Sequence, residues 1–120
     1  MMKNNKRLMR INDEIMKELS EILRSGELKD PRLAKITTVM RVETSSDLHH
    51  CNVRISVLGN DEDKAAVMQG IKSASGYIRK LIAERLNLRQ TPAFSFVLDD
   101  SVEYGIKMTE LINQVIANNE

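Results

Sequence analysis

The side chains best suited to binding chemistry surround a run of small residues, Ala74-Ser75-Gly76, which Lys72 precedes and Lys80 follows. Apolar residues recur at helical spacing on both sides of this run, and a glycine inside a helix costs about 1 kcal/mol relative to alanine. We therefore expect a kink between two helices at Ala74, Ser75 and Gly76. Small residues let another backbone approach closely, and the flanking cations can neutralise phosphates. The pattern predicts a clamp for a phosphate backbone, and the alternative is a packing kink beside a solvated basic face.

Positive charge is unevenly distributed along the chain, although the formal net charge is only +1. Residues 3–10 and residues 72–89 each carry a net charge of +4, whereas residues 99–120 carry −4. This asymmetry favours an anionic partner on one side of the molecule. Because aromatic residues make up only 3% of the chain, stacking of bases on aromatic platforms is not expected.

The candidate contacts for such a partner are the cations near the chain start, one arginine after the first proline, and the residues of the kink and its second helix. They are Arg7, Arg10, Arg32, Lys72, Ser75, Gly76, Arg79, Lys80, Arg85 and Arg89. Arg79 could instead pair with a nearby acid such as Glu84.

Two further clusters could suggest metal binding or catalysis, and neither supports it. In a strand, His49 and His50 point to opposite faces, and His49 with Cys51 supplies only two ligands, too few for a structural zinc site. Asp99 and Asp100 are adjacent acids at a predicted helix start, where acids usually act as caps. No nucleophile with its base and no phosphate-binding glycine loop with its lysine is evident. We therefore expect no enzymatic activity, no metal and no cofactor.

The length of 120 residues fits one domain with one modest core. Cys51 is the only cysteine, so no internal disulfide can form. No apolar run is long enough to span a membrane, and no apolar signal-peptide core follows the basic N-terminus. We expect a cytoplasmic monomer with a flexible basic N-terminus over residues 1–6, a domain over 7–117 and a frayed tail over 118–120.

Hydrophobic periodicity predicts the elements that position the kink. A helix over about 7–24 should end at Gly26, where glycine can terminate it. Two strands, over 36–43 and 51–57, should form an antiparallel hairpin, because only a short polar turn joins them. The inner face of the first strand is expected to carry Ile36, Met40 and Val42.

The sequence of the second half of the chain predicts a crossover connection that returns to the same sheet. Asn60 or Asp61 should cap a kinked helix pair over about 62–88. A third strand near 94–98 should then join the hairpin. A last helix should open at about residue 100, with Asp100 and Glu103 as a capping box, and its apolar side should carry Val102, Ile106, Met108, Ile112 and Val115.

The predicted order is α-β-β-α-kink-α-β-α, an α+β arrangement in which a three-stranded sheet packs on helices. It resembles a single type II K-homology (KH-like) domain, a nucleic-acid-binding module, with an A-x-G elbow in place of the usual G-x-x-G loop. With Lys29-Asp30-Pro31-Arg32-Leu33, Ser46-Asp47-Leu48 and Ala74-Ser75-Gly76-Tyr77-Ile78-Arg79, the chain resembles the bacterial ribosome-binding factor A family. The resemblance covers roughly residues 7–112.

This resemblance implies a non-enzymatic assembly factor that binds the small (30S) ribosomal subunit. Such a factor would assist late maturation and processing of the 5′ end of 16S rRNA, with a role in adaptation to cold. The implied partners are the small subunit and the 5′ region of 16S rRNA. The alternative is a protein-interaction module that contacts a ribosomal protein or an assembly GTPase rather than RNA.

Overall fold

The computed structural model describes residues 2–33, 37–99 and 109–117, with side chains from residue 6 onward. Its elements follow the predicted order, and the predicted α+β class with a three-stranded sheet packed on helices is confirmed. They are α1 (Met2–Ser25), η1 (Pro31–Leu33), β1 (Thr37–Thr44), β2 (His50–Val57), α2 (Asp61–Ser73), α3 (Ser75–Arg85) and β3 (Ala93–Leu98).

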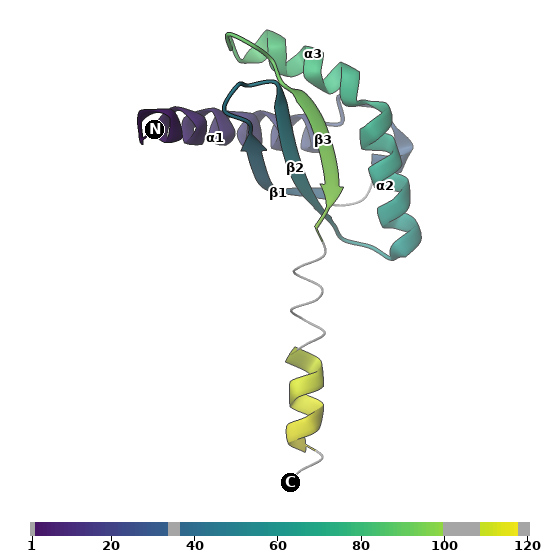
Figure 1. The fold of residues 1–120 in the computed structure, drawn as a ribbon. Coiled ribbons are helices and arrows are strands. Elements are labelled where there is room, and N and C mark those ends of the chain that lie inside the picture. Colours follow the sequence, from purple (N-terminus) through teal and green to yellow (C-terminus); the bar gives the residue numbers. More distant parts are fainter. Residues whose placement is uncertain (1, 34–36, 100–108, 118–120) are drawn as a thin grey trace.

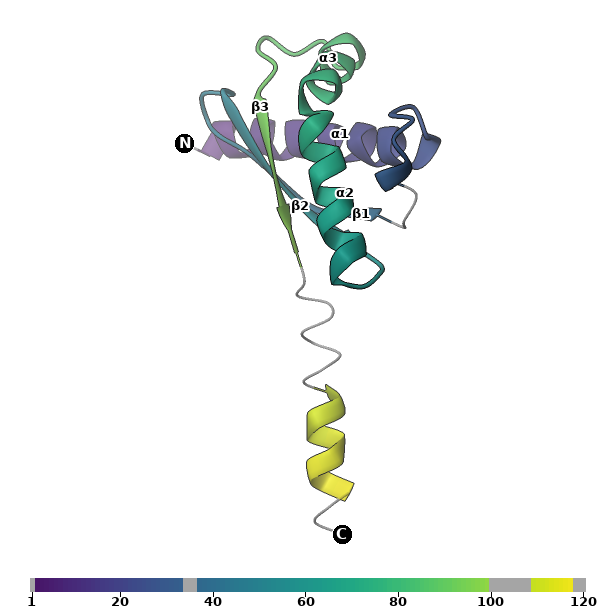
Figure 2. The same cartoon turned by 90° about the vertical axis from the view of Figure 1, so that its right-hand side faces the viewer.

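The sheet has the strand order β1-β2-β3 (Figure 1). β1 and β2 form the predicted antiparallel hairpin, and β3 lies parallel to β2. The kinked pair α2–α3 provides the crossover that a parallel connection requires. In Figure 1, α1 passes behind the sheet, and Figure 2 shows α2 and α3 lying to one side of β3.

One face of the sheet packs against the helices and forms the core. In β2, Cys51, Val53 and Ile55 are fully buried while the residues between them are outside, so the predicted period of two is confirmed. From the helices, the core receives apolar residues at the spacing of one helical face, mainly Ile15, Leu19, Ile22, Val67, Ile71, Ile78 and Ile82. The core therefore fixes α1, α2 and α3 on the same side of the sheet.

The predicted inner face of β1 is wrong at Met40. The pairing register shifts between Val39 and Arg41, which leaves Met40 as the extra residue of a β-bulge. Because a one-residue shift exchanges the two faces of a strand, Val39 and Val42 are buried whereas Met40 is 38% exposed. Ile36, which was also predicted to face inward, lies outside the described residues.

The first helix is longer than the sequence pattern predicts. It begins at Met2 rather than near Arg7, so residues 2–6 of the predicted flexible N-terminus are helical. No glycine or proline interrupts the chain before Gly26, and the polar residues at the start need no core contact to continue the helix. Gly26 has a φ of +77°, and this left-handed conformation ends the helix as predicted.

The start of α2 agrees with the prediction, and the end of α3 comes earlier than predicted. The Asp63 backbone N–H donates to Asn60 Oδ1 at 2.8 Å, and the Asn60 N–H donates to the Asp63 carboxylate at 3.0 Å, which completes a capping box. α3 ends at Arg85 rather than near Leu88, because Leu86 adopts an extended conformation.

The beginning of the predicted last helix, with its proposed capping box of Asp100 and Glu103, lies outside the described residues. Residues 109–117 are helical and exposed throughout. The apolar side predicted from Ile112 and Val115 is more than half exposed, as are Leu111 and Ile116. Among the described helices, none is both long enough and apolar enough to cross a membrane.

Candidate nucleic-acid interface

The junction between α2 and α3 turns at a single residue, Ala74. Its N–H donates to the carbonyls of Gly70 and Ile71 at 3.0 and 3.1 Å, and its own carbonyl accepts from the Ile78 N–H at 2.8 Å. Ala74 thus ends α2 and starts α3, with φ −89° and ψ 1°. The predicted kink at Ala74 is confirmed, whereas Ser75 and Gly76 are the first two residues of α3. We call residues 72–80 the elbow.

The outer surface of the elbow is open at Gly76. Gly76 is exposed, and a Cβ built on its backbone would meet no atom within 4 Å. No side chain caps α3, and the N–H groups of a first helical turn have no acceptor within their own helix. The elbow therefore presents backbone donors to solvent at the positive end of a helix dipole.

A close contact beneath α2 sets the direction of the elbow. Gly70 is buried against η1, and a Cβ at this position would lie 3.2 Å from Leu33 Cδ2 and 3.3 Å from Arg32 Cβ. Only a residue without a side chain permits this approach without a shift of its neighbours. The sequence pattern did not single out Gly70, because its role depends on a segment nearly forty residues earlier.

Two lysines of the elbow remain available for an external partner. Lys72 near the end of α2 and Lys80 in the middle of α3 are exposed, and neither forms an ion pair or hydrogen bond with the described residues. The same holds for Arg89, which follows α3, and for Arg7 and Arg10 on α1. Arg7 lies beside Ser46 and Leu48 of the β1–β2 turn rather than at the elbow.

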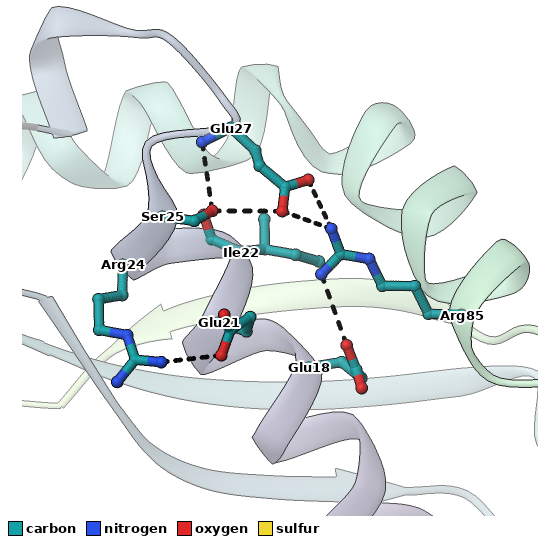
Figure 3. Close-up of polar contacts among 7 residues, drawn as sticks. All are labelled: Glu18, Glu21, Ile22, Arg24, Ser25, Glu27 and Arg85. Carbon is teal, nitrogen blue, oxygen red and sulfur yellow. Dashed lines mark hydrogen bonds and ion pairs between the residues drawn. The ribbon is translucent and has the colours of Figure 1, made fainter.

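Arg85 contacts carboxylates inside the protein (Figure 3). Its guanidinium donates to both oxygens of Glu27, at 2.6 Å to Oε2, and lies 3.5 Å from Glu18 Oε2. The hydrogen bond from Arg85 holds the pKa of Glu27 below its ordinary value, and the same contact raises the pKa of Arg85. These three residues, which we call the junction, join the end of α3 to α1 and to the turn that follows α1.

Two other candidate arginines also have partners within the protein. Arg32 forms a bidentate pair with Asp30, at 3.0 Å from Nε to Oδ1 and 2.7 Å from Nη2 to Oδ2. Hydrogen bonds from Arg32 hold the pKa of Asp30 below its ordinary value. Arg79 donates to the Thr91 carbonyl from Nη2 at 2.9 Å, and not to Glu84.

The ten candidate residues therefore fall into separate groups. Lys72, Ser75, Gly76 and Lys80 lie together at the elbow, and Arg7 and Arg10 lie on α1. Arg79 and Arg85 connect elements within the protein, Arg32 pairs with the nearby Asp30, and Arg89 lies exposed after α3. The sequence analysis missed Glu18 and Glu27 as partners of Arg85, since 67 and 58 residues separate them from it in the chain.

The residues of the histidine and cysteine cluster make structural contacts within the protein. His49 Nδ1 lies 2.9 Å from Gln90 Nε2, which links the β1–β2 turn to the loop after α3. Cys51 is buried in β2, as predicted for a small apolar residue, and burial raises the pKa of its thiol. Within the described residues, no group of three or more histidine, cysteine or acidic side chains is placed to hold a metal ion.

Comparison with known proteins places this chain beside one family. The profile of the family described as Ribosome-binding factor A matches residues 7–112. A relative from Agathobacter rectalis, called Ribosome-binding factor A, is 48% identical over 118 residues, which cover 98% of this chain and 97% of the relative.

Solved structures show the same fold. The solution structure of a Thermotoga maritima protein, described as a putative ribosome binding factor A, is 36% identical, with a TM-score of 0.67 over 76% of this chain and 85% of that one. A homology model of the Thermus thermophilus ribosome binding factor A, fitted into a cryo-EM map of a 30S complex, is 21% identical. It has a TM-score of 0.54 over 72% of this chain and 93% of that one, which supports the fold alone.

Proposed function

This chain belongs to the ribosome-binding factor A family, and on that premise we propose that it binds the small (30S) ribosomal subunit as a non-enzymatic assembly factor. It assists late maturation and 5′-end processing of 16S rRNA, acts in the cytoplasm as a monomer, and matters most in the cold. Membership of the family supports ribosome binding, and a homology model of the Thermus thermophilus family member has been fitted into a map of a 30S complex.

The observation that carries the proposal is the combination of unpaired cations and open backbone at the elbow. Lys72 and Lys80 hold RNA phosphates, and the exposed Gly76, which follows the half-buried Ser75 in the first turn of α3, lets the RNA backbone approach closely. Arg7, Arg10 and Arg89, which also lack partners within the described part of the chain, add contacts outside the elbow. Arg79 and Arg85 position the elements that carry these contacts, and Arg32 pairs locally with Asp30.

The proposed mechanism is a shift of conformational populations in the immature subunit. Phosphate contacts follow the shape of a folded RNA rather than its sequence. A factor that binds one RNA arrangement more tightly than another raises the population of that arrangement by its difference in binding free energy. No bond of the RNA needs to be made or broken by the factor itself.

The proposal is tested by co-sedimentation of the purified protein with small and large subunits across a salt series. We expect binding to the small subunit alone, with an affinity that falls steeply as salt rises, because each neutralised phosphate releases counterions. Binding to neither subunit, or equal binding to both, would contradict the proposal for a protein that is folded by circular dichroism.

A second candidate function is a protein-interaction module that contacts a ribosomal protein or an assembly GTPase. The exposed aliphatic residues of the helix over 109–117, Leu111, Ile112, Val115 and Ile116, favour an apolar protein partner. In this case binding would depend little on salt, and Leu111→Glu with Val115→Glu would abolish it. Retention of full binding by that folded variant would reject the second candidate.

A further inference from the structure

One aromatic ring is left outside the core at the elbow. The side chains of Phe94 and Phe96 stack on each other in β3 with their ring centroids 6.1 Å apart, and Phe96 is only 5% exposed. Tyr77 is 49% exposed and forms no hydrogen bond with the described residues. It lies in the first turn of α3, directly after the open backbone of Gly76. The ring is therefore carried by a rigid element, α3, and is available to an external partner.

Helical spacing places this ring beside an unpaired cation. Ile78, Leu81 and Ile82 turn toward the core, so the residues of the opposite side of α3 face solvent. Tyr77 and Lys80 are three residues apart and neighbours on that outer side. A lysine that attracts phosphate and a ring that offers an apolar face are the two parts of a site for single-stranded nucleic acid.

We propose that Tyr77 stacks on an unpaired base of the RNA whose backbone the elbow binds. The inference rests on the proposed RNA-binding function and specifies its target as a single-stranded or bulged stretch. Bases within a duplex are already stacked on each other, so they have no free face for the ring. The low aromatic content of the chain argues against an extended stacking platform, but one base needs only one ring.

The first test compares binding of two RNA probes, an oligoadenylate of about a dozen nucleotides and a duplex of equal length. Tyr77→Ala should lower affinity for the single strand by about 5- to 150-fold, the range found when one stacking ring is removed. Tyr77→Phe keeps the ring and should bind as the unaltered protein does. Val97→Ala, which trims an exposed apolar residue of β3, is the matched control and should have no effect.

The dependence on salt separates stacking from charge. Lys80→Gln should reduce the slope of log affinity against log salt concentration by about 0.7, as one phosphate contact to a single strand is lost. Tyr77→Ala should leave that slope unchanged while affinity falls, because stacking releases no counterion. A Tyr77→Ala variant that changes only the slope would overturn the proposal.

The composition of the chain also allows a direct optical test. There is no tryptophan, and Tyr77 and Tyr104 are the two tyrosines, so in a Tyr104→Phe variant all tyrosine emission comes from Tyr77. Stacking of a base on the ring should quench this emission as oligoadenylate is added, and free tyrosine amide in the same solution corrects for absorption by the RNA.

The outcomes distinguish this inference from the function on which it rests. If Tyr77→Ala and Tyr77→Phe both bind normally and no quenching occurs, while the double charge reversal of Lys72 and Lys80 abolishes binding to the small subunit, stacking is rejected and the assembly-factor function stands. If the double reversal has no effect on subunit binding either, the proposed use of the elbow fails as well.

Discussion

The elbow and the junction use the same kind of cationic side chain for different purposes. At the elbow, Lys72 and Lys80 are exposed and unpaired within the described residues. At the junction, Arg85 is 27% exposed and binds the carboxylates of Glu27 and Glu18 (Figure 3). The three cations Lys72, Lys80 and Arg85 all lie on the α2–α3 crossover, and the sequence pattern grouped them into one basic segment.

The difference follows from the chemistry of the two side chains as well as from their position. The planar guanidinium of arginine matches a carboxylate in two parallel hydrogen bonds, which suits it to joining elements within the protein. Lysine is a strongly hydrated point charge, which favours exposed contacts to phosphate. A count of positive charges along the chain therefore overestimates how many cations are available to RNA, because arginines paired within the protein contribute little to RNA binding.

The largest expected effect is on affinity for the small subunit, and it distinguishes the elbow from the rest of the basic surface. Lys72→Glu with Lys80→Glu should lower affinity for the small subunit by about 100-fold or more, since two phosphate contacts become repulsive. The matched control is Lys17→Glu with Arg54→Glu, which makes the same change in net charge on exposed residues of α1 and β2. Equal losses of binding for both variants would mean that total charge, rather than the elbow, directs binding. Circular dichroism checks that both variants fold.

The second prediction tests the junction. Arg85→Met should lower Tm by a few degrees, because Glu27 and Glu18 lose their partner and α3 loses its link to α1. At temperatures where the variant is folded, its affinity for the small subunit should stay within about threefold of the unaltered protein. An unchanged Tm with a large loss of binding would place Arg85 at the RNA instead, and the contrast between the two regions would fail.

The third prediction concerns pH. Because Arg85 holds the pKa of Glu27 below its ordinary value, the folded state favours the ionised carboxylate. This stabilisation is present above the ordinary carboxyl pKa of 4.5 and is lost as pH falls below it through the lowered pKa of the folded state. Urea unfolding across that range should show a smaller loss of stability in Glu27→Gln than in the unaltered protein.

The matched variant for the pH series is Arg85→Met, which removes the cause of the shift. It should flatten the pH dependence to a similar degree, and the double variant should add little to either change. Fully additive effects would show that Arg85 and Glu27 act independently, contrary to the geometry of the junction.

The smallest expected effect is at Gly76. Gly76→Ala should raise the free energy of unfolding by about 0.5–1 kcal/mol, because alanine is the better helix former and its Cβ meets nothing. Affinity for the small subunit should fall nonetheless, since the methyl group holds the RNA backbone away. Gly70→Ala is the opposite control, because its Cβ would press on Leu33 and overpacking costs about 1–3 kcal/mol. A stabilised Gly76→Ala with unchanged binding would remove Gly76 from the interface.

The sequence predicted most of the fold because the core obeys simple periodicities. The residues facing the core in α1 and β2 recur at the helical and strand spacings, and the small residues mark the break at Ala74. The bulge at Met40 escaped this reasoning, since Val39, Met40 and Val42 are all apolar and only pairing with β2 selects which of them face inward. Local composition contains no such information.

The candidate site was predicted less completely for a related reason. The type and spacing of residues identified every exposed lysine of the elbow, but not which arginines have partners in the folded chain. Arg32 and Asp30 are only two residues apart in the sequence, so their ion pair could have been anticipated. The contact between Arg85 and Glu27 spans 58 residues, so it exists only after α1 and α3 have come together. Base stacking was not expected from the low aromatic content, because composition describes an average and cannot report the exposure of one ring such as Tyr77.

The parallel pairing of β2 with β3 also sets the order in which the protein can fold as it is synthesised. The hairpin is complete once Val57 has been made, whereas its neighbour in the sheet begins at Ala93, after the whole of α2 and α3. At about 5–20 residues per second, this leaves one edge of β2 without a partner for a time on the order of seconds. Unpaired edges recruit other chains, so products that end between Val57 and Ala93 should aggregate although they contain an intact hairpin.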